Sequence, residues 1–225
     1  MNGLRFELEQ VIQKHHLLGH SFYQRWQAGQ LEKTELQGYS KEYYSFENEF
    51  SRFVSAIHSR CEDLPMRQQL LENLIHEEQG EDNHPALWKK FAEGLGVSET
   101  ELEQHFHSDA TQHLLKTYRD LCQNGTVEEG LAALYAYERQ QPDVARQKID
   151  GLKRFYNINE ASTLAFFQVH QTTDVYHSET EAALLERICQ DEASQKRAVA
   201  AAEKALLALN EFLTGVERRY RPEAA

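Results

Sequence analysis

Residues 160–187, EASTLAFFQVHQTTDVYHSETEAALLER, have the apolar spacing of one long helix, with apolar side chains recurring every three or four residues. His170, Asp174 and His177 follow one another at intervals of four and three residues. At about 100° per residue, these positions lie within roughly 60° of one another on a helix. Phe166 lies near the same face, so we expect that face to point into the protein.

This stripe predicts a metal site. Two imidazoles and a carboxylate that point inward need a partner that satisfies all three, and a metal ion is the commonest partner of that kind. A solvated polar stripe is the alternative, because neighbouring residues such as Gln171 and Glu179 are typical of a surface.

A second pair of candidate ligands precedes the stripe. Glu77 and His84 are seven residues apart, two turns along a helix predicted to begin near Pro65, so they would share a face. Asn83-His84-Pro85 is expected to end or kink that helix. Three acidic residues between the pair are alternative ligands or surface charges: Glu78, Glu81 and Asp82.

Glu138 completes the candidate set, in the apolar and aromatic segment Leu134–Glu138. A carboxylate buried among tyrosines requires a positive partner. Three carboxylates and three histidines from three helices suit a dinuclear centre of iron or manganese that reacts with dioxygen. The paired Glu-x-x-His motifs of ferritin-like proteins are missing from this set, so we expect a different helical bundle.

The remaining sequence predicts helices throughout. A capping box at Ser98–Glu101 indicates a short helix, and 191–220 is expected to be another long one. Breaks are expected at 124–126, 141–143 and 157–159. We find no strand pattern, internal repeat or long linker, and so predict one all-α domain spanning residues 1–225.

Composition narrows the possible functions. The 225 residues carry a formal net charge of −12, which disfavours binding to nucleic acid or anionic membranes. The three cysteines are far apart and odd in number, which is typical of reduced thiols in a cytoplasmic protein. No apolar run reaches the ~20 residues of a membrane span.

The order Glu77-x6-His84, Glu138, His170-x3-Asp174-x2-His177 resembles the ligand pattern of haem-oxygenase-like di-metal oxidases. The whole chain is similar to the family that includes the chlamydial protein associating with death domains. Ser21–Tyr23 and Ala145–Leu152 carry this similarity besides the ligands. The resemblance implies a haem-oxygenase-like bundle, a fold shared with thiaminase-like and pyrroloquinoline-quinone synthase proteins.

The resemblance also implies a reaction. The family makes para-aminobenzoate for folate biosynthesis as a self-sacrificing oxygenase, with dioxygen and an external electron donor. By position, Tyr23 would supply the ring and Lys148 the amino nitrogen. The metals would be Fe/Fe or Mn/Fe, held by the six residues named above. Tyr39, Tyr43 and Tyr137, which occupy apolar stripes, could host or relay a radical.

Several alternatives compete with this interpretation. The same ligands could serve an oxidase of a diffusible amino acid or fatty acid, which would not need Tyr23 or Lys148. A haem protein would use His15, His16 or His20, a thiaminase-like hydrolase would need a nucleophile such as Cys122, and a non-enzymatic protein would bind death domains. A further cluster suggests adventitious surface metal binding: His105, His107, Asp109 and His113.

A homodimer is also expected. The apolar stripe within 206–213 contains four leucines and a phenylalanine, and is broad enough to bury a partner.

Overall fold

The computed structural model describes residues 3–221, in which helices alternate with short loops and no strand is present. The helices are α1 (Leu4–Lys14), η1 (Leu17–Gly19), α2 (Ser21–Gln27), α3 (Lys33–Arg60), α4 (Leu64–Glu78), α5 (His84–Gly94), α6 (Glu99–Glu103), α7 (Asp109–Arg119), the π-helical turn η2 (Asp120–Asn124), α8 (Val127–Glu138), α9 (Gln141–Tyr156), α10 (Ala161–Ile188) and α11 (Glu192–Tyr220). The prediction of an all-α chain is confirmed.

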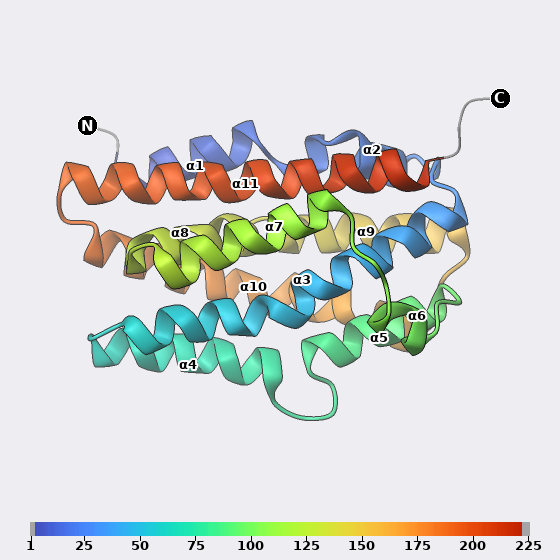
Figure 1. The fold of residues 1–225 in the computed structure, drawn as a ribbon, viewed down its shortest axis with the longest axis horizontal. Coiled ribbons are helices and arrows are strands. Elements are labelled where there is room, and N and C mark those ends of the chain that lie inside the picture. The colour runs from blue at the N-terminus through green and yellow to red at the C-terminus, as the bar shows by residue number, and fades with distance from the viewer. Residues whose placement is uncertain (1–2, 222–225) are drawn as a thin grey trace.

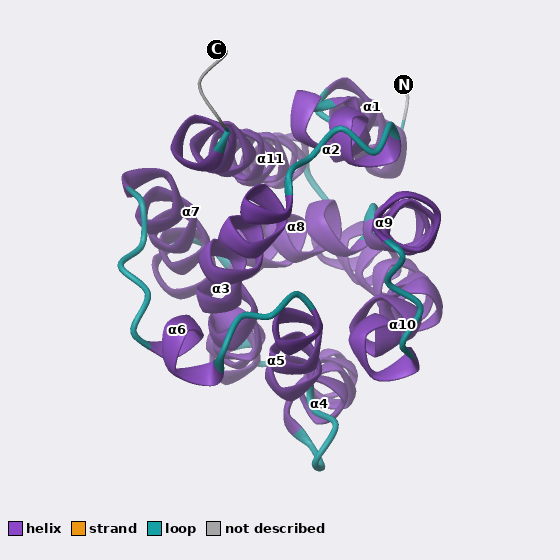
Figure 2. Cartoon of the chain, turned by 90° about the vertical axis from the view of Figure 1, so that its right-hand side faces the viewer, coloured by secondary structure: helices purple, strands orange, loops and turns teal. Residues whose placement is uncertain are grey.

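The helices form a bundle around α3 and α8. In the end-on view these two lie near the middle, with α11, α9, α10, α5 and α7 around them (Figure 2). The side view shows α11 along one long edge of the molecule and α4 along the opposite edge (Figure 1). Helices distant in sequence thus come together, with α10 packing on α9, α5, α8 and α4.

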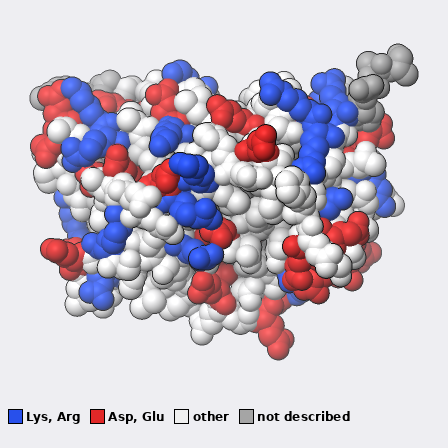
Figure 3. All heavy atoms as spheres, viewed as in Figure 1, with Lys and Arg blue, Asp and Glu red and all other residues white. Residues whose placement is uncertain are grey.

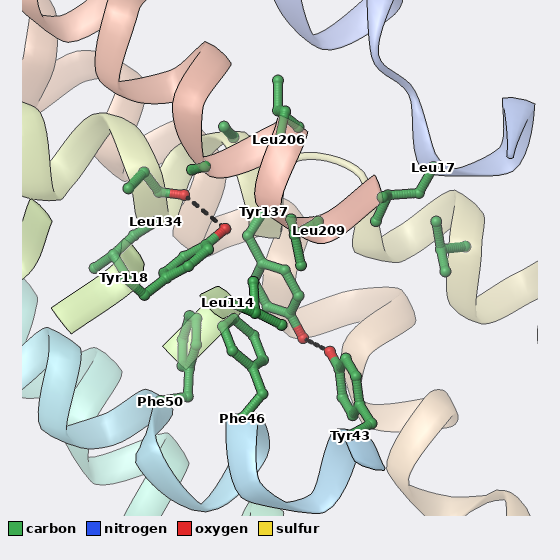
Figure 4. Close-up of a cluster of buried hydrophobic side chains, with 14 of the residues drawn as sticks. Leu17, Tyr43, Phe46, Phe50, Leu114, Tyr118, Leu134, Tyr137, Leu206 and Leu209 are labelled. Atoms are coloured by element: carbon green, nitrogen blue, oxygen red, sulfur yellow. Dashed lines mark hydrogen bonds between the residues drawn. The ribbon is translucent and has the colours of Figure 1, made fainter. Parts of the chain in front are cut away.

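α8 is buried on all sides, which its sequence explains. Every residue from Gly130 to Glu138 is buried. Small side chains allow close packing with α11, in which Ala201, Ala202 and Ala205 are also buried. On its other side, Tyr137 packs against the rings of Phe46 and Phe50 from α3 (Figure 4). A helix enclosed in this way carries its polar residue, Glu138, into the interior.

Most predicted helix limits are confirmed, because the residues at them make the expected caps. Ser98 accepts a hydrogen bond from the Glu101 backbone to begin α6, and α11 begins just after Asp191. Asn157 ends α9 in the left-handed conformation, with φ of 55°. The long helix of the predicted ligand stripe, α10, has the expected length.

The predicted helix through Glu77 and His84 is wrong. α4 ends at Glu78, and Gly80 follows with φ of 87°, which favours glycine. Asn83 then begins a new helix, because its side chain accepts a hydrogen bond from the Ala86 backbone at 3.0 Å. Pro85 occupies the first turn of α5, where its missing N–H is not needed. The segment therefore starts a helix instead of ending one.

The apolar stripe within 206–213 does not form a partner surface. Four of its five residues, Leu206, Leu209, Phe212 and Leu213, are buried within this chain, and only Leu207 is exposed. They belong to the hydrophobic core, where Phe212 packs against the rings of Tyr39 and Tyr43 from α3.

The surface carries both charges. On the face in Figure 3, Lys and Arg side chains occur among Asp and Glu, and acidic side chains gather over α6. Among the described residues, no helix combines the length and apolar character needed to span a membrane.

Candidate metal centre

The stripe predicted on the long helix faces the interior. α10 turns His170, Asp174 and His177 to one side, and each is at most 3% exposed. The predicted inward orientation is confirmed, and the alternative of a solvated stripe is wrong. Nδ1 of His170 lies 2.7 Å from the backbone oxygen of Phe166. A proton on Nδ1 would complete that hydrogen bond and leave Nε2 of the ring as a metal donor.

Glu77 and His84 meet although they lie on separate helices. Glu77 comes from the last turn of α4, and His84 is the first residue of α5. The loop between them folds back so that Glu77 Oε2 lies 2.7 Å from His84 Nδ1. Both side chains are buried. The predicted pairing therefore holds, but the helix break produces it instead of a shared helical face. Their acidic neighbours Glu78, Glu81 and Asp82 are exposed.

Glu138 enters the same region from α8. Its Oε1 accepts a hydrogen bond from the Asn73 side chain at 3.0 Å, and its Oε2 lies 3.8 Å from His177 Nδ1. Glu138 is 1% exposed. The structure thus brings all six predicted ligands into one buried region between α4, α5, α8 and α10.

Sequence reasoning missed Glu47, on α3. One donor atom each from Glu47, His84 and His170 lie within 4.8 Å of one another. Glu47 is 2% exposed. The signal was present, because Glu47 lies one helical turn from both Tyr43 and Phe50 on the inward face of a predicted helix.

Glu181 was also missed. It follows His177 by four residues and so extends the ligand stripe of α10 by one turn. Its side chain is buried at 3% exposure, and neither carboxylate oxygen has a hydrogen-bond partner.

The donor atoms fit a metal ion. Among the described residues, most of the buried side-chain atoms that lack a hydrogen-bond partner gather here, beside the close pair Glu77 and His84: Glu47 Oε2, Glu138 Oε2, Asp174 Oδ2, His177 Nδ1 and both oxygens of Glu181. An unsatisfied buried polar group costs about 1–3 kcal/mol. Cations held by these lone pairs would remove that cost, and carboxylate oxygens with imidazole nitrogens suit iron or manganese.

The electrostatics lead to the same conclusion. Burial, together with the charge of nearby carboxylates, raises the pKa of Asp174 well above its usual range. The same effects raise the pKa of Glu47 and of Glu138 to about 8. Burial lowers the pKa of His170 well below its usual value. So many carboxyl groups repel one another when ionised, and bound cations would relieve that repulsion.

Tyr23 and Lys148 meet in a second buried cluster. Both contact the same hydroxyl, that of Tyr39: the Tyr23 oxygen lies 3.0 Å from it, and Lys148 Nζ donates to it at 2.8 Å. The amine lies 5.1 Å from the centre of the Tyr23 ring. α2, α3 and α9 supply one residue each, so the bundle assembles this cluster from distant parts of the chain.

Lys148 has an unusual environment for a lysine. Its side chain is 2% exposed and faces the rings of Tyr39, Tyr43 and Phe167 at 5.1, 5.5 and 5.2 Å. Burial lowers the pKa of its amine to about 7. A neutral amine, which is the nucleophilic form, is therefore well populated near neutral pH.

The two clusters are connected by aromatic rings. The rings of Tyr39 and Tyr43 stack at 5.4 Å, and the hydroxyls of Tyr43 and Tyr137 hydrogen-bond to each other (Figure 4). Tyr137 precedes the candidate ligand Glu138. Burial raises the pKa of Tyr43 and of Tyr137 strongly, with a further rise from the charge of Glu47. The three predicted relay tyrosines thus form a continuous chain beside the centre.

Residues 37–210 match the model of a family described as an iron-containing redox enzyme of the haem-oxygenase type. The chain belongs to this family. It is 39% identical to the 4-aminobenzoate synthase of Nitrosomonas europaea, over 97% of this chain and 93% of that protein. It is 46% identical to the 4-aminobenzoate synthase of Chlamydia pneumoniae, over 80% of each. The predicted resemblance is confirmed, and the chain is an oxidoreductase.

Solved structures of other proteins share this fold. A homologue of TenA from Pseudomonas syringae superposes with a TM-score of 0.82 at 14% identity, covering 96% of this chain and 91% of that one. A CADD-like protein of unknown function from Nostoc punctiforme gives a TM-score of 0.78 at 18% identity, covering 97% and 99%. The predicted haem-oxygenase-like bundle is confirmed.

The second predicted cluster, of three histidines and Asp109, is arranged differently in the structure. His105 and His107 lie in the loop before α7 and approach Glu42, at 3.1 and 3.8 Å. Asp109 is not part of this group, and His113 pairs with Glu211 on α11. One donor atom each from Glu42, His105 and His107 lie within 4.8 Å of one another, and the Arg219 guanidinium also contacts Glu42, at 2.8 Å.

The residues that a haem protein or a thiaminase-like hydrolase would use have other surroundings in this structure. His16 and His20 accept hydrogen bonds from the backbone at the starts of η1 and α2, and His15 contacts Glu203. Cys122 is buried, and burial raises the pKa of its thiol, so it is a poor nucleophile. Neither a haem ligand nor a thiaminase-like cysteine is indicated.

Proposed function

We propose that this chain makes 4-aminobenzoate from its own residues, with Tyr23 as the source of the ring and Lys148 as the source of the amino nitrogen. One observation carries the proposal: the buried Lys148 amine lies against the Tyr23 ring, and both groups share the Tyr39 hydroxyl. The 4-aminobenzoate synthases to which the chain is 39–46% identical support the choice of product.

The atoms of the product specify what each residue would contribute. In 4-aminobenzoate the amino group is para to the carboxylate, and in tyrosine the hydroxyl is para to Cβ. Nitrogen from Lys148 would therefore replace the phenol oxygen of Tyr23, while the Cε–Nζ bond of Lys148 breaks and Cε is oxidised to an aldehyde. Cβ would be oxidised to the carboxylate carbon as the Cα–Cβ bond breaks, which leaves a glycyl residue at position 23. The exchange at the ring carbon is not itself an oxidation. One dioxygen would supply both oxygens of the carboxylate, and a second would be reduced to water by two electrons from Lys148 and two from an external donor.

The metal ligands in this proposal are the six predicted residues, Glu77, His84, Glu138, His170, Asp174 and His177, which would hold two ions as Fe/Fe or Mn/Fe. The burial of all six residues supports this assignment, and so do the unpaired donor atoms of Glu138, Asp174 and His177. When bound, such a centre supplies the capacity to activate dioxygen. Glu47 offers an additional oxygen beside His84 and His170.

Other residues would prepare the reacting groups. Tyr39 holds the Lys148 amine and the Tyr23 phenol together by accepting or donating at its single hydroxyl. The aromatic rings around Lys148 exclude water and keep a fraction of the amine neutral. Tyr43 and Tyr137 would carry an electron or a radical between this cluster and the metal ligands, through their hydroxyl contact and ring stacking.

The size of the internal space favours an internal substrate. The hollow lined by Tyr23, Tyr43 and Tyr137 has a volume of about 10 Å³. That is room for about one water molecule. An oxidase of a free amino acid or fatty acid would need much more space beside the same tyrosines.

The test is a single aerobic reaction of the metal-loaded protein with a reductant. Protein labelled with ¹⁵N-lysine should release at most one ¹⁵N-labelled 4-aminobenzoate per chain, and the peptide containing Tyr23 should lose mass. Tyr23→Phe should release none. The matched control is Tyr118→Phe, because Tyr118 is also buried but its hydroxyl makes only a 3.5 Å contact to the Ala133 backbone.

Three results would contradict the proposal. Release of product by Tyr23→Phe in the wild-type amount would exclude Tyr23 as the source of the ring. Release of unlabelled product would exclude lysine as the source of the amino nitrogen. Metal-dependent oxygen uptake without product or peptide change would favour a diffusible substrate instead.

A further inference from the structure

His76 lies on the outside of α4 and is exposed to solvent, yet it contacts the buried candidate ligand His177. The two imidazole rings stack with their centroids 5.1 Å apart and their planes 17° from parallel. His76 Nδ1 lies 2.8 Å from His177 Nε2, which is a hydrogen-bond distance. An exposed residue thus contacts the outer edge of a residue assigned to the metal centre.

The surroundings of His177 determine the direction of this hydrogen bond. Its Nδ1 is buried without a hydrogen-bond partner and faces Glu138 Oε2 at 3.8 Å. A metal ion would therefore take the lone pair of Nδ1. An imidazole that binds a metal through one nitrogen carries its proton on the other, so His177 Nε2 would donate to His76 Nδ1. His76 would then carry its own proton on Nε2.

Two neighbours of His76 on α4 also belong to the metal centre or contact one of its ligands. Asn73, one turn earlier on α4, donates its amide to the candidate ligand Glu138 at 3.0 Å. Glu77, the next residue after His76, is itself a candidate ligand. One helix therefore contributes a ligand and also contacts two other ligands that come from α8 and α10.

We propose that His76 is a positioning residue of the metal centre, which fixes the proton of His177 on Nε2 and holds its Nδ1 toward the metal. This inference rests on the proposed function, since it needs the metal centre but not the fate of Tyr23. Outer partners of ligating histidines typically contribute 10- to 100-fold to metal affinity.

The test compares two substitutions that separate the hydrogen bond from the ring stack. His76→Phe keeps an aromatic ring but removes the acceptor. His76→Asn removes the ring but places an amide oxygen near the position of Nδ1. His113→Phe is the control, because His113 is also exposed but lies on α7, far from His76 in the sequence. The measurements are equilibrium Fe(II) binding without oxygen and the visible spectrum of the Co(II)-loaded protein.

We expect His76→Phe to bind one of two Fe(II) equivalents about 10- to 100-fold more weakly and to change the Co(II) spectrum. His76→Asn should retain most of the wild-type affinity, and His113→Phe all of it. The inference is overturned if His76→Phe keeps the wild-type affinity and spectrum, or if His76→Asn loses as much affinity as His76→Phe.

Failure of the proposed function would be distinguishable. If the wild type binds fewer than two Fe(II) ions, the dinuclear centre is wrong. If the wild type and His76→Phe both bind two with equal affinity, only the role of His76 is wrong. Thermal unfolding of the three metal-free variants identifies any general loss of folding.

Discussion

At the scale of single residues, Lys148 is the group whose environment departs most from its usual one. A lysine normally keeps its ammonium in water, whereas this amine is enclosed by aromatic rings and hydrogen-bonded to one phenol. Burial brings its pKa to about 7, against about 10.4 in an unfolded chain. Stability and reactivity should therefore both depend on the proton of this one residue.

Replacing Lys148 by methionine tests this pKa. Between pH 7 and about 10.4 the unfolded chain binds a proton that the folded chain does not, so the free energy of unfolding of the wild type rises with pH. Below pH 7 the folded protein must bury the charge. We expect Lys148→Met to be more stable than the wild type at pH 6, and this advantage to shrink by up to about 1.4 kcal/mol per pH unit above pH 7.

Urea unfolding of both metal-free proteins at pH 6, 8 and 9.5 measures the difference directly. A difference that stays constant across that range would mean that the amine remains charged in the folded state.

At the scale of the helices, the break between α4 and α5 positions two candidate ligands. Glu77 ends one helix and His84 begins the next, and the cap at Asn83 fixes the start of α5. A single straight helix would have carried the two side chains about 10 Å apart along its axis, since each residue rises 1.5 Å. The break instead brings them to 2.7 Å.

Removing the cap should therefore affect both stability and metal binding. Asn83→Ala loses the hydrogen bond to the Ala86 backbone, and we expect about 1 kcal/mol lower stability. The first turn of α5 would fray and carry His84 with it, so affinity for Fe(II) should also fall. Ser98→Ala, which removes a comparable cap from α6, should lower stability without changing Fe(II) affinity. Equal metal affinities in the two variants would show that the cap does not position His84.

The contact between α2 and α9 controls how Tyr23 meets Lys148. Gly151 of α9 lies against the Trp26 indole, and an added Cβ would be 2.6 Å from an indole carbon. The same indole N–H donates to the Lys148 backbone oxygen at 3.2 Å. Any side chain at position 151 must therefore push the two helices apart.

We expect Gly151→Ala to lower the free energy of unfolding by about 1–3 kcal/mol, because overpacking outweighs the gain of about 1 kcal/mol in helix propensity. Release of 4-aminobenzoate should fall as well, because Lys148 moves relative to the Tyr23 ring. Gly19→Ala is the control, since no atom lies within 4 Å of its added Cβ. Chemical denaturation measures the stability of each variant, and the yield of 4-aminobenzoate measures its reaction. If Gly151→Ala is destabilised but keeps the wild-type yield, this helix contact does not control how Lys148 meets Tyr23.

At the scale of the whole molecule, the bundle encloses a group of carboxylates that repel one another. Glu47, Glu138, Asp174 and Glu181 are all buried, and the pKa of each is raised, first by burial and then by carboxylates nearby. Ions that bind only the folded state stabilise it by about 2.7 kcal/mol when present at 100 times their dissociation constant.

Chelation of the metal should consequently lower the melting temperature by about 5–10 °C, at about 2–4 °C for each kcal/mol in a chain of this size. The loss should be larger at pH 8 than at pH 6. Carboxyl groups with folded pKa values of about 8 stabilise the metal-free protein only while protonated, and that contribution disappears as pH rises. Calorimetry with and without added Fe(II) at pH 6 and pH 8 measures the change in melting temperature. An equal change at the two pH values would contradict the prediction.

The sequence by itself determined the helical class, most helix limits and the inward face of His170, Asp174 and His177, because these depend on periods and caps that act within a few residues. Only the tertiary structure decided that Glu77 and His84 meet across a loop, and that Glu47 joins them from α3. It also turned the stripe at 206–213 inward. Such contacts depend on how distant helices pack, and a local pattern of apolar and polar residues does not specify which faces will meet.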